Sequence, residues 1–390
     1  MGMGRACRDR SSPWPNTAGT QVVNVDRRRL LTIAPGVIGG ASLLAACAAG
    51  SDQKDYEALA AQIRHEGAVA GGAKLAAQME LVRNATLAPS SHNTQCWKFM
   101  VEPSAITILP DPLRRCPAVD PDDHHVFVSL GCATENLIQA ALASGLKGQA
   151  VYDENREAIR VALVPTKGFV SPLFNAIAAR QCTRGEYDSQ PLSPGELGLL
   201  ERAGSSSEVR MLLLTERGAL EQVLDYVVQA NTVQMADPAF VSELKSWIRF
   251  NGAQAVQRRD GLYSATTGNP NIPTWLGELA FGALYRPKAE NDKYVRQMRS
   301  SAGIALFVAQ SADKAHWVDV GRCYERFALQ ATALGIRNAL VNQPVEVSSV
   351  RPQFASAFGL AGQRPDLVVR FGRGSAMPPS LRRSVPAVLV

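Results

Sequence analysis

The stretch Ala88–Phe99 reads APSSHNTQCWKF and lies where an alanine-rich, helix-forming run ends. Pro89 cannot continue that helix, and a strand pattern begins at Trp97. Between them, two serine hydroxyls, an asparagine and a glutamine occupy one turn. Such a turn suits hydrogen bonding to a flat ligand rich in heteroatoms. Taken alone, the stretch fits a ligand site and an ordinary helix stop about equally.

The composition is that of a globular protein, since 46% of the 390 residues are hydrophobic and 19% are charged. The net charge is +6, but the first 46 residues hold six arginines and two aspartates, which leaves only +2 for the rest. We therefore expect no nucleic-acid partner. The seven cysteines form no Cys-x-x-Cys pair and do not cluster with histidines, so we expect no metal site. The adjacent His124 and His125 should diverge, as a surface or helix-cap pair.

The first 46 residues have the pattern of a targeting segment. Asp26-Arg27-Arg28-Arg29 precedes a moderately apolar stretch that ends in Leu44-Ala45-Ala46-Cys47. The arginines resemble a twin-arginine (Tat) signal, and the last four residues resemble the lipobox of bacterial lipoproteins. The apolar stretch, diluted by proline and glycine, is too short to span a membrane stably. We expect residues 1–46 to be removed, Cys47 to be lipidated, and the protein to be an exported, membrane-anchored lipoprotein of the periplasm or cell envelope.

Helix and strand patterns are interspersed along the remaining chain, which predicts an α+β protein. In the first part, residues 55–85 form two helices, 97–102 and 105–109 a hairpin, 126–145 a long helix, and 148–152 and 159–164 two strands. In the second part, we expect helices at 171–180, 216–234, 238–250, 274–284 and 313–336, and strands at 208–214 and 302–309. Ser193 and Glu196 have the spacing of a helix capping box.

The two long helices repeat one another at a constant offset of 190 residues. Gly131-x-x-x-Glu135 and its Ala-x-Ala-x-Gly ending recur as Gly321-x-x-x-Glu325 with the same ending. We therefore expect two fused, diverged halves, residues 47–168 and 169–390, with an insertion at about residues 235–275 in the second.

Several segments resemble motifs of the nitroreductase family of FMN enzymes. Ala88–Trp97 resembles Ala-Pro-Ser-Ser-x-Asn-x-Gln-Pro-Trp, with Cys96 in place of the proline, and Arg180–Arg184 resembles Arg-x-Ser-x-Arg, with Cys182 in place of the serine. Asn342–Val347 resembles the Pro-x-Glu-Gly loop, with Val347 in place of the glycine. Toward the C-terminus, Phe358-Gly359-Leu360, residues 367–372 and residues 379–383 follow in family order.

The resemblance implies which residues hold FMN, and it demands no catalytic residue from the protein because flavin N5 carries the chemistry. The loop near N5 would be Pro344, Val345, Glu346 and Val347. The FMN-binding residues would be Pro89, Ser90, Ser91, Asn93, Gln95, Arg180, Gln181, Cys182, Arg184, Glu346, Gly372, Arg382 and Arg383. Arg180, Arg184 and Arg382 would hold the phosphate, with Arg383 as a helper.

The order of the motifs implies an internal pseudo-dimer. In single-unit nitroreductases the arginine motif comes first, and each flavin lies between two subunits. Here the serine motif lies in the first half and the arginine motif in the second. We therefore expect a nitroreductase-like fold with mixed sheets flanked by helices, one FMN per chain, and a monomer.

The function that follows is an exported FMN oxidoreductase that passes two electrons to a small acceptor, a nitroaromatic or a quinone. Because NAD(P)H is cytoplasmic, a membrane quinol or a redox partner would donate the electrons. The alternative is a flavin-storage protein without turnover, like the fused, lid-bearing Acg-like branch, in which Trp247, Phe250 and Tyr263 of the insertion would cover the flavin or simply form core. A periplasmic solute-binding lipoprotein stays open as a third class. A hydrolase at Ser91-His92 is disfavoured because no Gly-x-Ser-x-Gly surrounds that serine.

Overall fold

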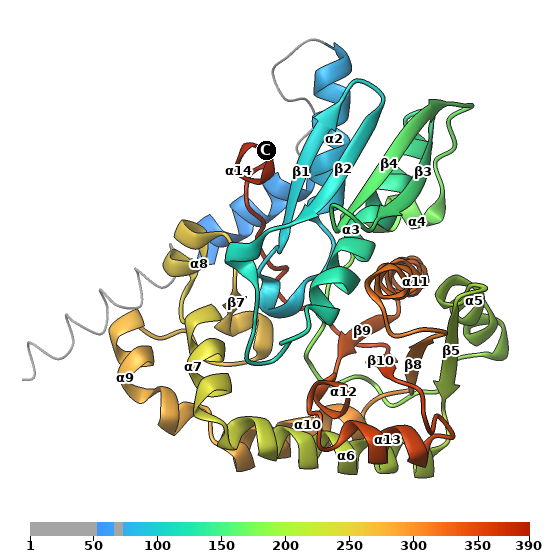
Figure 1. The fold of residues 1–390 in the computed structure, drawn as a ribbon. Helices are drawn as coiled ribbons and strands as arrows, with labels where there is room; N and C mark the ends of the chain where they lie inside the picture. Colours follow the sequence, from blue (N-terminus) through green and yellow to red (C-terminus); the bar gives the residue numbers. More distant parts are fainter. Residues whose placement is uncertain (1–52, 66–72) are drawn as a thin grey trace, which may run out of the picture. The chain divides into compact units, whose positions relative to one another are not determined.

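Two four-stranded antiparallel sheets form the framework of the computed structural model, which describes residues 53–65 and 73–390 (Figure 1). The first sheet has the order β1-β2-β4-β3 and the second the order β5-β8-β10-β9. Their strands are β1 (Trp97–Glu102), β2 (Ala105–Pro110), β3 (Leu146–Asp153), β4 (Ala158–Pro165), β5 (Val209–Leu214), β8 (Gly303–Ala309), β9 (Arg337–Leu340) and β10 (Pro365–Gly372). In each sheet the strands therefore lie in the order first, second, fourth, third.

The same succession of elements builds both halves. A 20-residue helix follows the second strand of each sheet, α3 (His124–Ala143) after β2 and α11 (Lys314–Ala333) after β8. When α3 is matched with α11, the two sheets agree in strand order and in antiparallel pairing. The structure thus has the fused two-half arrangement that the sequence repeat predicts.

The two long helices cross at a pair of glycines. A Cβ atom on Gly131 would lie 2.0 Å from the carbonyl oxygen of Val318, and one on Gly321 would lie 1.9 Å from that of Val128. These contacts are related by the offset of 190, so each helix presents the same patch to the other, as in a two-fold symmetric dimer. The largest core cluster includes Phe127 of α3 and Phe327 of α11, so the halves share one core. Residues 48–390 accordingly form one compact unit.

The remaining elements surround this framework. Residues 53–65 are helical. The other helices are α2 (Ala73–Thr86), α4 (Pro172–Ala176), α5 (Pro194–Gly204), α6 (Arg217–Ala236), α7 (Pro238–Trp247), α8 (Gly252–Arg258), α9 (Thr274–Leu284), α10 (Pro287–Arg299), α12 (Gln343–Glu346), α13 (Arg351–Ala357) and α14 (Val385–Val388), with short turns η1 (Ser91–Asn93), η2 (Pro112–Arg114) and η3 (Ser264–Thr267). Strands β6 (Ile248–Arg249) and β7 (Leu262–Tyr263) pair in parallel. Figure 1 shows α6, α10, α12 and α13 packed together beside the second sheet.

The α+β class is confirmed, and the details refine the predicted sheets. All ladders in the two large sheets are antiparallel, and parallel pairing is limited, among the described residues, to β6 with β7 and to bridges at two sheet edges, Phe99 with Leu389 and Cys182 with Asn338. The hairpin turn falls at Pro103-Ser104, as predicted. The Ser193 capping box is present, since Ser193 Oγ accepts from the Glu196 amide and the Glu196 carboxylate accepts from the Ser193 amide.

Two predicted helices need correction, and two helices were not predicted. The helix at 171–180 is shorter and ends at Ala176, and the one at 238–250 ends at Trp247 because the next two residues pair as β6. Helix α10 was not predicted, because its sequence is rich in charged residues and has no apolar run to reveal it. Helix α8 lies in a stretch predicted as loop, where the Asn251 side chain caps it by accepting from the Gln254 amide.

Several sequence predictions fall outside the described residues. These are the targeting segment at residues 1–46, its arginines 27–29 and the lipidation site at Cys47. Within the described chain, α3 alone is long and apolar enough to cross a membrane, and 78% of that stretch is buried inside the protein. Its place between α2 and α11 is that of a core helix.

Candidate functional site

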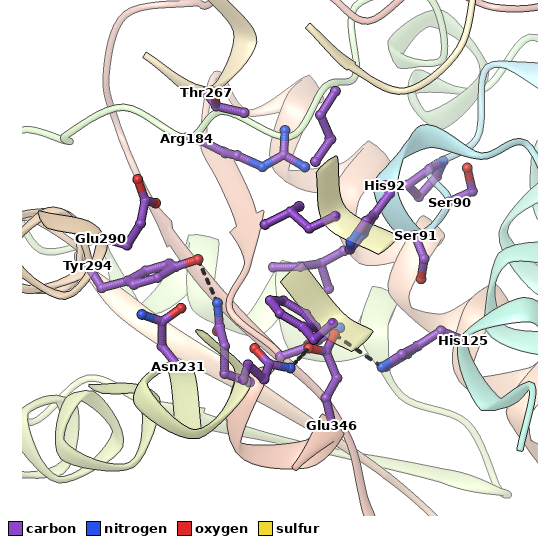
Figure 2. Close-up of a pocket in the computed structure, with 18 of the residues that line it drawn as sticks. Ser90, Ser91, His92, His125, Arg184, Asn231, Thr267, Glu290, Tyr294 and Glu346 are labelled. Atoms are coloured by element: carbon purple, nitrogen blue, oxygen red, sulfur yellow. Dashed lines mark hydrogen bonds and ion pairs between the residues drawn. The ribbon is translucent and has the colours of Figure 1, made fainter. Parts of the chain in front are cut away.

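A pocket lies between the two halves, and its volume, which includes open solvent at the mouth, is about 1310 Å³. Figure 2 shows Ser90, Ser91 and His92 along one side, Glu290, Tyr294 and Asn231 opposite them, Arg184 and Thr267 at one end, and His125 and Glu346 at the other. The first half contributes residues 89–92 and one face of α3. The second half contributes the rest of the wall, so the site requires both halves.

The Ser-Ser turn, residues 89–96, is held in an unusual backbone conformation. His92, Asn93 and Gln95 have φ angles of 48°, 55° and 56°, in the left-handed region that residues other than glycine rarely adopt. Ser90 Oγ accepts from the Gln95 amide at 2.9 Å and ties the turn together. Such conformations persist only where surrounding contacts enforce them, and they concentrate at functional sites.

Asn93 and Gln95 supply those contacts and do not line the pocket. Asn93 Nδ2 donates to the carbonyls of Gly261 and Leu381 at 3.0 and 3.2 Å. Gln95 Nε2 donates to the Arg259 carbonyl at 2.8 Å, and its Oε1 accepts from the Arg383 amide at 2.7 Å. The prediction that these two amides bind the ligand is therefore corrected, because their polar atoms hold the turn against the insertion and the C-terminal segment.

Arg180 and Arg382 are also turned away from the pocket. The Arg382 guanidinium donates to the carbonyls of Thr86, Leu87 and Ala88 at 2.7 to 3.1 Å and to Asn93 Oδ1 at 2.9 Å. Arg180 Nη2 donates to the Leu87 carbonyl at 2.7 Å, and its Nε lies 3.1 Å from Glu325 Oε1. Both side chains fix the entrance to the Ser-Ser turn and lie outside the described pocket lining, so their assignment to a phosphate stays a prediction.

Arg184 is the arginine of the predicted set that lines the pocket, together with Pro89, Ser90, Ser91 and Glu346 (Figure 2). None of the hydrogen bonds within the described chain uses its guanidinium. His92 lies nearby, and burial, reinforced by the charge of Arg184, lowers its pKa to about 4, so the imidazole is neutral. On the side opposite His92, Lys293 lies 3.7 Å from Glu290, and burial lowers the pKa of this lysine.

The other predicted ligands lie outside the described pocket lining. Arg383 donates to the Gln95 carbonyl and to Asp111. Gly372 packs against Tyr187, Gln181 is half-buried, and Cys182 pairs with Asn338. In the loop predicted to approach N5, Pro344 and Val345 are buried, and Val347 packs with Ala230 and Val350. Val347, which stands in place of the glycine of the Pro-x-Glu-Gly loop, is therefore part of the core and lies outside the described pocket lining.

The histidine pair at the start of α3 is buried, contrary to the prediction of a surface or cap pair. His124 is 1% exposed and lies 2.9 Å from Asp366, and His125 is 5% exposed and lines the pocket. His125 Nε2 lies 3.5 Å from Glu346 Oε1, and Gln234 Nε2 donates to the other oxygen of Glu346 at 2.7 Å (Figure 2). Burial raises the pKa of Glu346 to about 7 and lowers the pKa of His125 well below its usual range.

The insertion closes one side of the pocket with residues that sequence analysis did not select. They are Met235, Phe240, Leu244, Ile248, Leu262, Thr267 and Asn269, joined just beyond the insertion by Tyr285. Trp247, Phe250 and Tyr263 do not line the pocket: Trp247 faces Arg249, Phe250 packs on Phe281, and Tyr263 packs on Tyr56. In the sequence, the length of the insertion is the only feature that indicated that it covers a ligand site.

Comparisons with known proteins relate this chain to the nitroreductases. No family model matches. Two curated relatives from strains of Mycobacterium tuberculosis, each named "Putative NAD(P)H nitroreductase", are 25% identical over 318 residues, which cover 78% of this chain and 88% of theirs.

Similar solved structures include a nitroreductase with bound FMN from Bacteroides fragilis (14% identity, 53% of this chain and 89% of that chain, TM-score 0.33). A second is an FMN-dependent nitroreductase from Mycobacterium smegmatis in complex with NADPH (15% identity, 52% and 88%, TM-score 0.33). Both TM-scores are below 0.5, so the fold assignment rests on the two sheets described above and not on these similarities.

Proposed function

We propose that this chain, as a relative of the nitroreductases, is an FMN-dependent oxidoreductase that passes two electrons to a small acceptor, a nitroaromatic or a quinone. The observation that carries the proposal is a large pocket between two fused halves, bounded by the strained Ser-Ser turn and by Arg184. The names of the curated relatives support the reaction class.

The residues at the pocket fit FMN. Arg184 and the hydroxyls of Ser90 and Ser91 offer a cation and two donors, which suit a phosphate or a polyol. On other parts of the wall, His92 Nε2 and Gln343 Oε1 are buried polar atoms without a hydrogen-bond partner, as expected where a ligand with heteroatoms completes the site. When bound, FMN supplies hydride exchange; the chain binds it, orients it and limits its contact with water.

Replacing Arg184 with alanine is expected to weaken FMN binding by roughly tenfold to a hundredfold. The reason is that a hydrogen bond to a charged group contributes about 1.5–3 kcal/mol, and each 1.4 kcal/mol is about a tenfold change in affinity. Quenching of FMN fluorescence measures the change. The matched control is Arg210→Ala, which removes an exposed arginine of β5 that donates to Gln363, outside the described pocket lining. Equal affinities for the two variants would contradict the role of Arg184.

One observation favours flavin storage as a second candidate. The insertion lines the pocket with Phe240, Leu244 and Ile248, so these side chains occupy space that a nicotinamide donor would need. An anaerobic titration of the FMN-loaded protein with NADH and with a quinol separates the two functions. Reduction of the flavin on the timescale of turnover identifies a reductase, whereas a flavin that neither donor reduces identifies a store.

We further propose that the protein is exported and anchored through Cys47, with a membrane quinol or a redox partner as donor. The support is the run Arg27-Arg28 and the lipobox-like Leu44–Cys47. Changing Arg27 and Arg28 to lysine should leave the precursor in the cytoplasm, because twin-arginine signals require that pair, and Cys47→Ala should prevent lipidation. Cell fractionation and metabolic labelling with a radioactive fatty acid measure both effects. Unchanged export and labelling would remove the proposal.

The proposed oligomeric state is a monomer. The two halves already make the helix contact at Gly131 and Gly321 that has the symmetry of a dimer, and both contribute to one pocket. A second copy of the chain is not needed to complete that pocket.

A further inference from the structure

We infer that Glu346 is the residue that delivers a proton to the acceptor reduced in the pocket, and that His125 positions its carboxyl group. This inference rests on the proposed oxidoreductase function and adds a protein acid to a reaction otherwise ascribed to the cofactor alone. It follows from the meeting of Glu346, His125 and Gln234 at one end of the pocket, away from Arg184 (Figure 2).

The carboxyl group of Glu346 is held between two side chains from different helices. Gln234 of α6 donates to Glu346 Oε2 at 2.7 Å, and His125 of α3 places Nε2 3.5 Å from Glu346 Oε1. Helix α12 is itself tied down, since the Arg351 guanidinium donates to the carbonyls of Val345 and Glu346. Glu346 therefore has a fixed place at the pocket wall and one oxygen beside a neutral imidazole.

The charges around Glu346 favour its protonated form. Burial is the main cause of the raised pKa of about 7, and the carboxylates of Asp120 and Glu243 reinforce it. Each of these two carboxylates accepts two backbone N–H bonds, Asp120 from His125 and Val126, and Glu243 from Ala118 and Val119. The Gln234 hydrogen bond and the Arg351 charge act in the opposite direction, and the nearby Cys116 thiol is neutral because burial raises its pKa.

His125 cannot cancel the charge of a Glu346 carboxylate. Burial, together with the nearby His124 and the charge of Arg364, lowers the pKa of His125 well below its usual range, so the ring stays neutral at physiological pH. A neutral imidazole can orient the carboxyl group without fixing it as an anion. A carboxylic acid with a pKa near 7 is suited to general acid catalysis, because both of its protonation states are populated at neutral pH.

The step balances for a quinone acceptor. A quinone becomes a hydroquinone when it takes up a hydride at one oxygen and a proton at the other. The hydride and its electron pair come from the reduced donor, a nicotinamide or a quinol, which is oxidised. The proton leaves the O–H bond of Glu346 and forms the second O–H bond of the product. Glu346 remains as a carboxylate and regains a proton from water.

The test uses Glu346→Gln, which keeps the size and hydrogen-bonding capacity of the side chain but removes its acidic proton. The FMN-loaded protein is reduced with dithionite without oxygen, mixed with p-benzoquinone, and its reoxidation is followed across a range of pH. In the unaltered protein the rate should fall as pH rises through about 7, where Glu346 loses its proton. In Glu346→Gln it should be lower by about 10²–10⁴-fold at low pH and independent of pH in that range.

Two further variants separate proton delivery from general effects on the pocket. Glu290→Gln alters another carboxyl group of the lining, one that lies 3.7 Å from Lys293, and should keep the fall in rate near pH 7. His125→Phe should displace the midpoint of the pH profile, whereas a purely structural role would lower the rate at an unchanged midpoint. An independent readout needs no cofactor, namely the infrared difference between the unaltered cofactor-free protein and Glu346→Gln. Burial also raises the pKa values of Glu325, Asp120 and Asp366 to about 7, so other protonated carboxyl bands remain in the variant, but the one band that the variant loses should titrate near pH 7.

The outcomes distinguish this inference from the function on which it rests. If Glu346→Gln binds FMN but reoxidises with the rate and pH dependence of the unaltered protein, Glu346 is not the proton donor and the inference is overturned while the oxidoreductase function stands. If the unaltered, folded protein takes up no FMN, the proposed function fails and the inference falls with it. Loss of the infrared band together with loss of the pH dependence supports it.

Discussion

Replacing Gly131 with alanine should destabilise the protein by about 3 kcal/mol or more, at the upper end of what overpacking costs. The added Cβ would lie 2.0 Å from the Val318 carbonyl oxygen. This obstacle is backbone, so no side-chain rotation can relieve it, and α3 must move away from α11 at the centre of the shared core. Denaturant unfolding followed by circular dichroism measures the free energy of unfolding.

Gly218→Ala is the matched control. Gly218 also lies in a helix, α6, but a Cβ there would meet no atom within 4 Å, so alanine should be neutral or stabilise by up to about 1 kcal/mol. Gly321→Ala should cost about as much as Gly131→Ala, because the two contacts are symmetric. If both helix-crossing variants were as stable as Gly218→Ala, the close approach of α3 and α11 would be wrong.

Replacing Arg180 with alanine should destabilise the protein by about 3–5 kcal/mol, because it removes one partner of a buried ion pair. Arg180 is 2% exposed and Glu325 is fully buried, and the loss would also leave the Leu87 carbonyl without its donor. Burial raises the pKa of Glu325 to about 7, and Arg180 opposes that rise. Without Arg180, the pKa of Glu325 would rise further, so the carboxyl group would stay neutral to a higher pH and then become an unpaired buried anion. The loss of stability should therefore grow as the pH rises above about 7.

An exposed pair serves as the comparison. Arg299 lies 2.8 Å from Glu221 on the surface, and Arg299→Ala should leave the stability close to that of the unaltered protein, because solvent screens an exposed ion pair. Replacing Arg180 and Glu325 together with methionine and leucine should recover most of the loss, since apolar residues of similar volume often substitute for a buried pair. A single Arg180→Ala variant as stable as Arg299→Ala would contradict the buried pair.

Much of the framework could be predicted from local patterns. Alternating strands around Pro103-Ser104, the Ser193 cap and the offset of 190 between the long helices depend on residues close together in sequence or on direct repetition. These features correspond to the hairpin, the start of α5 and the two equivalent halves. The position of the Ser-Ser turn at the pocket was also predictable, because Pro89 had to end the helix before β1.

The roles of individual side chains were less predictable. Arg382 bonds to carbonyls of residues 86–88, almost three hundred positions earlier, so its sequence neighbourhood carries no sign that its donors are already used. In the sequence, two adjacent polar residues such as His124 and His125 predict an exposed pair. In the structure other elements surround α3 on most of its length, so both rings are buried. The sequence does not show which aromatic side chains of the insertion point into the pocket. In the structure Phe240 lines the pocket and Trp247 does not.

The central claim is one FMN per chain in the pocket between the two halves, and equilibrium dialysis of the purified protein against FMN tests it most directly. The predicted result is saturation at one FMN per chain, with weaker binding by Arg184→Ala and unchanged binding by Arg210→Ala. A protein that keeps its circular dichroism spectrum and unfolds cooperatively, yet retains no FMN at any concentration tested, would contradict the claim.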